Sequence, residues 1–192
     1  MDKIAPEERK YVWMERPDLL GLASPKVPAG YEIRTYRSGD AAGWTELQRE
    51  VRDDMQVDAP TFDNEFGAPE ETRSHRILFA IAPGGKVVGS VAAWYGDEGP
   101  SGKHGSIHWM AVLKAHRERG LGTALLLQAL QTMSAMHSAA YLSTATFLLP
   151  AVRMYLKAGF RPGIASDDDR SAWEYIGRHI PHPAIHEALT RT

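Results

Sequence analysis

The sequence predicts a single soluble domain of mixed α/β or α+β class. A chain of 192 residues is the size of one domain and can bury roughly 70% of its unfolded surface. Hydrophobic residues make up 43% and charged residues 24%, which is typical of globular proteins. Short β-rich runs alternate with amphipathic patterns along the chain, and no internal repeat interrupts them.

The first third of the chain predicts few regular elements. Residues 31–37 alternate as in a β-strand, and residues 38–51 predict a helix for which Asp40 is the candidate N-cap. Residues 52–72 are polar and interrupted by prolines, so they predict a loop with room for one short helix. Residues 1–30 are rich in proline and charge and predict an extension. Its apolar side chains suffice to dock it on the domain: Tyr11, Trp13, Leu19, Leu20 and Leu22.

The middle of the chain has the clearest pattern. Residues 76–82 and 87–95 predict a hairpin around a Pro-Gly-Gly turn, and residues 106–113 predict the next strand. Residues 120–137 place leucines on one face and polar residues on the other, which predicts an amphipathic helix. Residues 139–146 predict another strand.

The C-terminal part predicts one helix and one hairpin. Residues 149–159 predict a short helix, with Pro150 in its first turn and Gly159 at its C-terminal cap. The runs FRPG and SAWEYIG, which include residues 160–163 and 171–177, predict a final hairpin. The remaining residues predict a polar tail.

Composition excludes several classes of protein. The 22 Lys and Arg residues are balanced by 24 Asp and Glu, so we expect no nucleic-acid partner. The absence of cysteine excludes disulfides, thiolate zinc sites and a cysteine nucleophile. No apolar run approaches the ~20 residues of a membrane span, and the opening MDKIAPEERK is too charged for a secretory signal. We therefore expect a cytoplasmic protein with no membrane partner.

Three histidines near the C-terminus have metal-like spacing. His179, His182 and His186 could share one face, but Pro181 and Pro183 make joint ligation awkward. We expect no metal.

The segment KAHRERGLGTALL, residues 114–126, carries the chemical signal. Each of Gly120 and Gly122 costs a helix about 1 kcal/mol relative to alanine, so a compensating reason is needed. Without β-carbons, a helix N-terminus can present several free amides to an anion, and three basic residues surround this one. A solvated basic loop is the competing interpretation. A dinucleotide fingerprint fits poorly because Leu125 replaces its third glycine, and no Walker Gly-Lys-Ser/Thr follows.

Two motifs in order resemble the GCN5-related N-acetyltransferase (GNAT) family. The first is R-x-x-G-x-G, from Arg117 to Gly122, and the second is A-x-x-x-Y-x-K-x-G-F, from Ala151 to Phe160. The resemblance covers most of residues 31–177. It implies a GNAT fold, with a central, mostly antiparallel, splayed sheet flanked by helices. The domain would span residues 31–178, between an extension (1–30) and a tail (179–192).

The resemblance also implies the activity and the binding site. Acetyl-CoA would be the co-substrate, and the acetyl group would pass to a primary amine of a small molecule or peptide by direct attack in a ternary complex. The pantetheine arm would pair with the strand backbone, and the pyrophosphate would lie on the following turn. The residues implied are Met110, Ala111 and Val112 for the first, and Arg117, Arg119, Gly120, Leu121, Gly122 and Thr123 for the second.

Two catalytic residues are expected. By motif, Tyr155 lies near the coenzyme sulfur, although a core aromatic is the alternative. The family often has an Asn where this chain has Leu148, and some members have a Glu base where Ser143 stands, so the base must come from elsewhere. His108 has a suitable intrinsic pKa and lies on the strand that approaches the acyl group. Its alternatives are Asp97, Glu98 and water.

Other questions stay open at this stage. Trp44, Trp94 and Tyr95 could line an acceptor pocket or pack in the core. A non-catalytic acyl-CoA-binding module is the alternative function. The acceptor, the acyl-chain preference, a homodimer and the role of the first 30 residues cannot be derived from the sequence.

Overall fold

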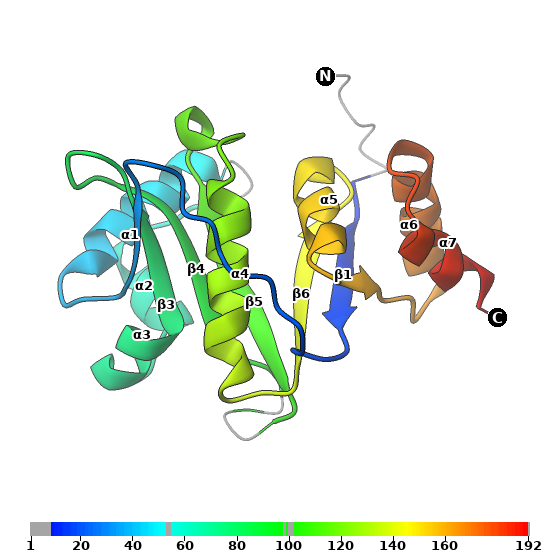
Figure 1. The fold of residues 1–192 in the computed structure, drawn as a ribbon, viewed down its shortest axis with the longest axis horizontal. Coiled ribbons are helices and arrows are strands. Elements are labelled where there is room, and N and C mark those ends of the chain that lie inside the picture. The colour runs from blue at the N-terminus through cyan, green and yellow to red at the C-terminus, as the bar shows by residue number, and fades with distance from the viewer. Residues whose placement is uncertain (1–8, 53–54, 98, 100–101, 192) are drawn as a thin grey trace. The chain divides into compact units, whose positions relative to one another are not determined.

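The described residues form seven strands and seven α-helices in two compact units. The computed structural model describes residues 9–52, 55–97, 99 and 102–191. The larger unit comprises residues 19–137, and the smaller comprises residues 1–18 together with 138–192 (Figure 1). No helix within the described ranges is long and apolar enough to cross a membrane.

The larger unit contains four strands and four α-helices. In chain order they are β2 (Glu32–Thr35), α1 (Asp40–Val51), α2 (Ala59–Glu65), α3 (Glu70–Arg76), β3 (Ile77–Ile81), β4 (Val87–Tyr95), β5 (His104–Val112), the 3-10 helix η2 (Lys114–His116) and α4 (Leu121–Ser134). The strands pair antiparallel in the order β2-β3-β4-β5.

Helices cover both faces of this sheet (Figure 1). Ile77, Phe79 and Ile81 of β3 belong to the core cluster that includes α1 and α2. Their neighbour Ala80 faces the opposite side, where a β-carbon added to Gly89 would lie 2.9 Å from Leu125 of α4. Because its side chains alternate, β3 contributes to the hydrophobic packing on both faces of the sheet.

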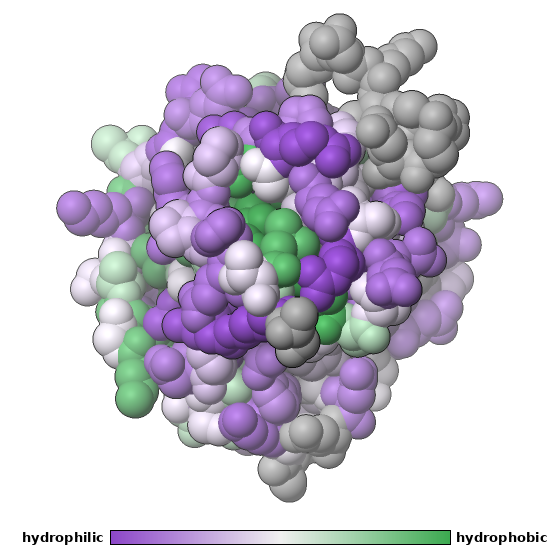
Figure 2. Space-filling view, turned by 90° about the vertical axis from the view of Figure 1, so that its right-hand side faces the viewer, coloured by the Kyte–Doolittle hydropathy of each residue, from purple (hydrophilic) through white to green (hydrophobic). Residues whose placement is uncertain are grey.

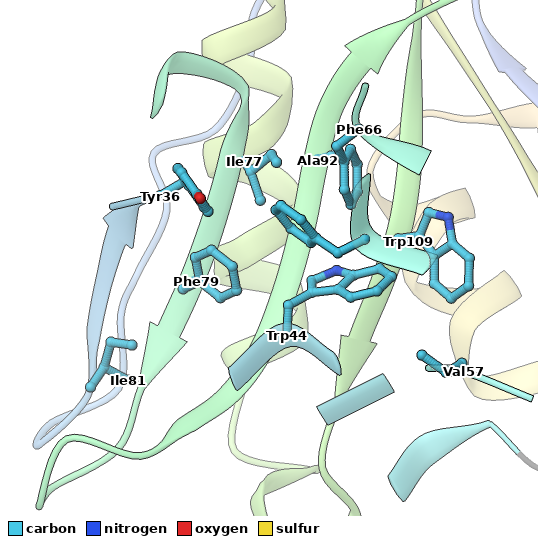
Figure 3. Packing of buried hydrophobic residues seen from close by; sticks show 10 residues of the cluster. Tyr36, Trp44, Val57, Phe66, Ile77, Phe79, Ile81, Ala92 and Trp109 are labelled. Atoms are coloured by element: carbon cyan, nitrogen blue, oxygen red, sulfur yellow. The ribbon is translucent and has the colours of Figure 1, made fainter. Parts of the chain in front are cut away.

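An aromatic cluster joins α1 and α2 to the sheet (Figure 3). The Trp44 ring lies 5.3 Å from Phe62, 5.5 Å from Phe66 and 4.9 Å from Trp109, all edge to face. Trp44 is fully buried, so it packs in the core and does not line a pocket. Edge-to-face aromatic pairs add about 0.5–1.5 kcal/mol each beyond their buried area. The cluster therefore fixes α2 over β5.

A β-bulge interrupts the pairing of β4 with β5. The register shifts between Ser90 and Ala92, and Trp109, on the opposite strand, has φ +48°. The buried Gln48 side chain donates to the carbonyl of Trp109 at 3.1 Å and to Ser90 Oγ at 3.0 Å. These bonds stabilise a backbone conformation that is rare for a residue other than glycine.

The smaller unit is built on three strands and three helices. They are β1 (Tyr11–Arg16), β6 (Ala139–Ala145), α5 (Leu149–Lys157), β7 (Arg161–Pro162), α6 (Asp167–His179) and α7 (Pro183–Thr190). β1 lies between β6 and β7 and is antiparallel to both. Val12 and Met14 are buried, whereas Tyr11 and Trp13 are partly exposed. Part of the N-terminal extension is thus a strand, which the sequence analysis missed despite this alternation.

One face of the smaller unit carries a shallow hollow. Figure 2 faces α6 and α7 and shows a small apolar patch within a mainly polar surface. A hollow of about 380 Å³ in this unit is lined by apolar residues, three arginines and one glutamate: Pro162, Ile164, Ala184, Ala188, Arg161, Arg170, Arg191 and Glu187.

Most predicted elements are confirmed. The strands β2 to β6 and the helices α1, α4 and α5 occupy the expected ranges. Pro150 lies in the first turn of α5, and Gly159 follows that helix with φ +87°. The mixed α/β class and the antiparallel pairing are therefore as expected.

Two predictions in the first third are wrong. Gly39 in a left-handed conformation is the N-cap of α1, because the carboxylate of Asp40 is engaged by the Arg34 guanidinium at 2.6 and 2.8 Å. The second prediction is wrong in extent, because it allows one short helix in residues 52–72 and the range contains both α2 and the start of α3. The apolar contacts of these helices are made by few residues, chiefly Phe62 and Phe66.

The predicted C-terminal hairpin is also wrong. Residues 171–177 lie within α6, whose N-cap Ser166 accepts from Asp169 N at 3.1 Å. Three acidic residues in the first turn favour the helix further. The polar tail is likewise mostly the helix α7, with Ile185 buried against the unit. The predicted domain limits themselves stay a prediction.

Candidate active site

The turn between β5 and α4 contains the residues that the sequence predicts to meet the pyrophosphate. Glu118 and Gly120 both adopt left-handed conformations, with φ +61° and +85°. The first hydrogen bond of α4 runs from Ala124 N to Gly120 O at 3.0 Å, so the amides of the three residues between them have no acceptor within the helix. Alternating left-handed residues and a helix N-terminus together direct amides outward.

This turn is open at its centre. Apart from Gly120 and its two neighbours in the chain, no heavy atom of the described residues lies within 4 Å of the position that a β-carbon on Gly120 would take. Arg117, Arg119 and Thr123 are exposed. Arg117 Nε donates to the carbonyl of Val112 at 2.9 Å, so this arginine braces the end of β5. The 3-10 helix η2 before the turn contacts Tyr31, whose hydroxyl lies 2.9 Å from His116 Nδ1.

The residues predicted to meet the pantetheine arm lie on β5. Met110, Ala111 and Val112 are half-buried, and the last two pair with Ser90 and Gly89 of β4. β5 is the last strand of the larger unit's sheet. Their role in binding stays a prediction.

His108 lies beside a carboxylate that the sequence analysis did not single out. His108 Nε2 is 3.0 Å from Glu65 Oε2, and Trp109 Nε1 donates to the same oxygen at 2.6 Å. The side chains of His108 and Glu65 are 35% and 33% exposed, so both contact solvent. The Phe66 ring lies 5.8 Å from the imidazole, and the Arg52 guanidinium lies 4.2 Å above the Trp109 ring.

These surroundings lower the pKa of His108 below its usual 6.5. The main cause is burial, which disfavours the imidazolium. Glu65 acts in the opposite direction through its hydrogen bond and charge, and Arg52 adds a further lowering of the pKa. At pH 7 the imidazole is therefore mainly neutral, as a proton acceptor requires.

Tyr155 occupies a buried position on α5. Its ring is 7% exposed and packs edge to face against Phe160 at 5.9 Å. Val152 and Leu156 on the same helix are buried with it. This packing fits a core aromatic as well as a catalytic one, so its role stays a prediction.

The other candidates are less informative. Asp97 is exposed, and Glu98 lies outside the described residues. Trp94 is partly exposed, and its ring lies 5.0 Å from Phe66 and 5.3 Å from Tyr95. A second hollow, of about 240 Å³ beside α1, contains none of the predicted site residues.

Among the described residues no group of three His, Asp or Glu is arranged to hold a metal ion. The C-terminal histidines serve local structure instead. His179 Nδ1 lies 2.9 Å from the carbonyl of Tyr175, and His182 Nδ1 accepts from Ala184 N at 3.2 Å.

Glu65 is not singled out by the sequence because the pattern allows one short helix in residues 52–72 but does not locate it. A signal was present, because Asp58 and Thr61 form a capping box at the start of α2. Phe62 and Phe66 follow at helical spacing and are both buried. A helix in that register places Glu65 beside Phe66 at the end of α2.

One family model and many solved structures are similar to this chain. The model of the acetyltransferase (GNAT) family matches residues 42–160. No curated protein matches the chain significantly. Among solved structures, a GCN5-related N-acetyltransferase from Sphaerobacter thermophilus is 20% identical, with a TM-score of 0.67 over 81% of this chain and 49% of that one.

Two further structures show the same fold. An acetyltransferase from the GNAT family from Colwellia psychrerythraea is 12% identical, with a TM-score of 0.61 over 81% of this chain and 54% of its own. A tandem GNAT protein from the clavulanic acid biosynthesis pathway is 22% identical, with a TM-score of 0.56 over 80% and 50%. The chain thus matches about half the length of each of these three proteins.

Proposed function

Since the chain belongs to the acetyltransferase (GNAT) family, we propose that it is an acetyl-CoA-dependent N-acetyltransferase acting on a primary amine of a small molecule or peptide. The amine attacks the thioester directly in a ternary complex, and no acyl-enzyme forms. This class of acceptor is the one that the sequence predicts.

The observation that carries this proposal is the open amide turn at the start of α4. The amides of Leu121, Gly122 and Thr123 have no acceptor in the helix, and the space over Gly120 is empty of described atoms. These features fit a diphosphate, which needs several donors at close range. The turn directly follows β5, whose backbone at 110–112 would pair with the amides of the pantetheine arm.

His108 is the proposed base. An amine with a pKa near 10.4 is neutral in only about one molecule in a few thousand at pH 7, so its proton must be removed before attack. The lowered pKa of His108 keeps its imidazole neutral and ready to accept that proton. Asp97, the alternative, lies exposed in the loop before β5.

Tyr155 is proposed to stabilise the departing thiolate. Complete proton transfer from a phenol of pKa ~10 to a thiolate whose conjugate acid has a pKa of ~8.5 is uphill by roughly 2 kcal/mol. A hydrogen bond from the Tyr155 hydroxyl is therefore the expected contribution. Tyr155→Phe should then lower turnover while coenzyme affinity stays nearly intact, and unchanged turnover would remove this role.

Calorimetric titration with CoA and with pantetheine tests the amide turn. Pantetheine lacks the diphosphate, so it should bind at least about 100-fold more weakly, since hydrogen bonds to charged groups contribute about 1.5–3 kcal/mol each. Equal affinities would contradict the assignment of the turn.

Release of free thiol from acetyl-CoA, measured with spermidine, tyramine, glucosamine and a lysine peptide, tests the activity. Turnover that depends on an amine supports the proposal. Tight coenzyme binding without turnover on any amine would instead support a non-catalytic acyl-CoA-binding module.

A further inference from the structure

One carboxylate oxygen receives N–H groups from two consecutive residues of β5. Glu65, the last residue of α2, lies 3.0 Å from His108 Nε2 and 2.6 Å from Trp109 Nε1 through the same Oε2 atom. Consecutive residues of a regular strand point to opposite faces of the sheet. The arrangement therefore requires an irregular strand at this point.

The bulge supplies that irregularity. The register of β4 and β5 shifts opposite this position, and Trp109 adopts φ +48°. Gln48 holds the carbonyl of Trp109 in place at 3.1 Å, and Trp44 packs against its ring at 4.9 Å. Because this conformation is strained for a bulky residue, the buried contacts around it must maintain it. Its effect is to bring two neighbouring ring nitrogens to one oxygen.

The contact decides which imidazole nitrogen carries the proton. A carboxylate has no hydrogen to give, and the oxygen already accepts from the indole N–H, which is only a donor. The His108–Glu65 bond thus requires a proton on Nε2. In the neutral imidazole the lone pair is then on Nδ1.

We propose that Glu65 is a positioning residue that holds His108 as the Nε2–H tautomer, so that Nδ1 is the atom that removes the proton from the acceptor amine. This inference rests on the proposed function. None of the described residues forms a hydrogen bond with Nδ1, and the side chain is about a third exposed to solvent.

The proton balance is simple. Nδ1 accepts one proton from the ammonium form of the acceptor, and the resulting imidazolium keeps its Nε2–H bond to the Glu65 carboxylate. The neutral amine nitrogen then forms the new C–N bond as the C–S bond breaks. The second proton leaves the nitrogen as the amide forms and neutralises the departing thiolate, and the imidazolium then releases its proton to solvent. Glu65 itself gains no proton.

Two charged groups among the described residues face this imidazole, one from each neighbouring segment. Glu65 at the end of α2 stabilises the imidazolium, and Arg52 after α1 disfavours it. The opposing effects of Arg52 and Glu65 therefore keep His108 neutral before the reaction, and the Glu65 carboxylate stabilises the imidazolium after it. A base needs both properties.

Nitrogen-15 NMR of histidine-labelled protein tests the tautomer without any acceptor. The wild type should show His108 protonated at Nε2, with an N–H proton shielded from exchange, and His108→Gln identifies that signal by its loss. Glu65→Gln should retain the signal, because its amide oxygen can accept the same bonds. Glu65→Met, which has no oxygen, should lose it. Trp109→Phe, which leaves the pair intact, should retain it.

Kinetics then separate a positioning role from a structural one. Glu65→Met should lower the plateau of kcat roughly 10–100-fold, as loss of an orienting partner does at other sites. It should have no further effect in a His108→Gln background, since residues that act as a unit are not additive. Glu65→Gln should keep most of the plateau rate and move the acidic limb of the pH profile to lower pH. Asp63→Asn, which removes a carboxylate from the same helix, should leave the limb in place.

Three results would overturn the proposal. They are a wild-type His108 protonated at Nδ1, a loss in Glu65→Gln as deep as in Glu65→Met, and fully additive effects of the His108 and Glu65 substitutions. If no amine is acetylated while the Nε2–H signal persists, the failure lies with the proposed function and with catalytic use of the pair, and the contact itself stands.

Discussion

Two histidines of the larger unit, His108 and His137, have opposite environments. His108 is partly exposed and its Nε2 faces an acceptor, the Glu65 carboxylate. His137 is 5% exposed and its Nε2 faces a donor, Arg76 Nη1, at 3.3 Å. Its Nδ1 lies 2.8 Å from the carbonyl of Gly102 and must therefore donate. The neutral forms of the two residues are thus opposite tautomers.

The difference shows how partners decide what a histidine does. The nitrogens of His137 both have protein partners, so this residue ties the end of α4 to Arg76 and to the loop before β5. His108 has one partnered nitrogen, and its other nitrogen forms no hydrogen bond with a described residue. The first arrangement suits structure, and the second suits proton transfer.

The largest expected effect is on activity at His108. His108→Gln should lower kcat/KM roughly 10²–10³-fold, because general bases contribute about that much to the rate. Stability should change little, since the side chain is partly exposed. Steady-state kinetics and thermal denaturation measure the two effects. His186→Gln, at an exposed position on α7, is the control.

The reverse is expected at His137. His137→Phe removes the acceptor of Arg76 and the donor to the Gly102 carbonyl, so it should lower the free energy of unfolding by about 1–3 kcal/mol. The folded fraction should retain its kcat. Urea denaturation measures the free energy of unfolding, and steady-state kinetics corrected for the folded fraction measure kcat. A loss of kcat without a loss of stability would break the comparison.

The pH dependence of activity and of stability should report on His108. Burial lowers the pKa of His108 below 6.5. As the pH is lowered, kcat/KM should therefore stay at its plateau value past pH 6.5 and fall only when the pH passes through the lowered pKa. The unfolded chain binds this proton more readily, so stability is present above about pH 6.5 and is lost as the pH falls. His108→Gln should flatten this part of the stability profile, whereas a profile unchanged by the substitution would contradict it.

The smallest effect is expected at Arg52. Arg52→Met keeps an apolar side chain near the Trp109 ring but removes the charge, so the pKa of His108 should rise and the acidic limb should move to higher pH. This direction is opposite to that of Glu65→Gln. A limb that moves the same way in both variants would show that packing, rather than charge, controls His108.

Local pattern was enough to predict most of the larger unit. The alternation of β3 and β4 around a Pro-Gly-Gly turn, and the leucine face of α4, are signals that tertiary contacts reinforce. The prediction of a hairpin strand within α6 failed because Trp173, Tyr175 and Ile176 favour β-strands when each is considered alone. In the structure these residues are buried on a helix whose N-cap is Ser166.

The sequence by itself determined the family, because two motifs of neighbouring residues at fixed spacing encode it. The turn with its two glycines and His108 as the candidate base stay predictions from the sequence. Only the tertiary structure decided that Glu65 meets His108 and Trp109, since a helix 43 residues away must pack over a bulged strand to bring them together. The bulge depends on buried partners such as Gln48 and Trp44 rather than on local propensity. Contacts of that kind are made by packing, and no short stretch of the chain contains them.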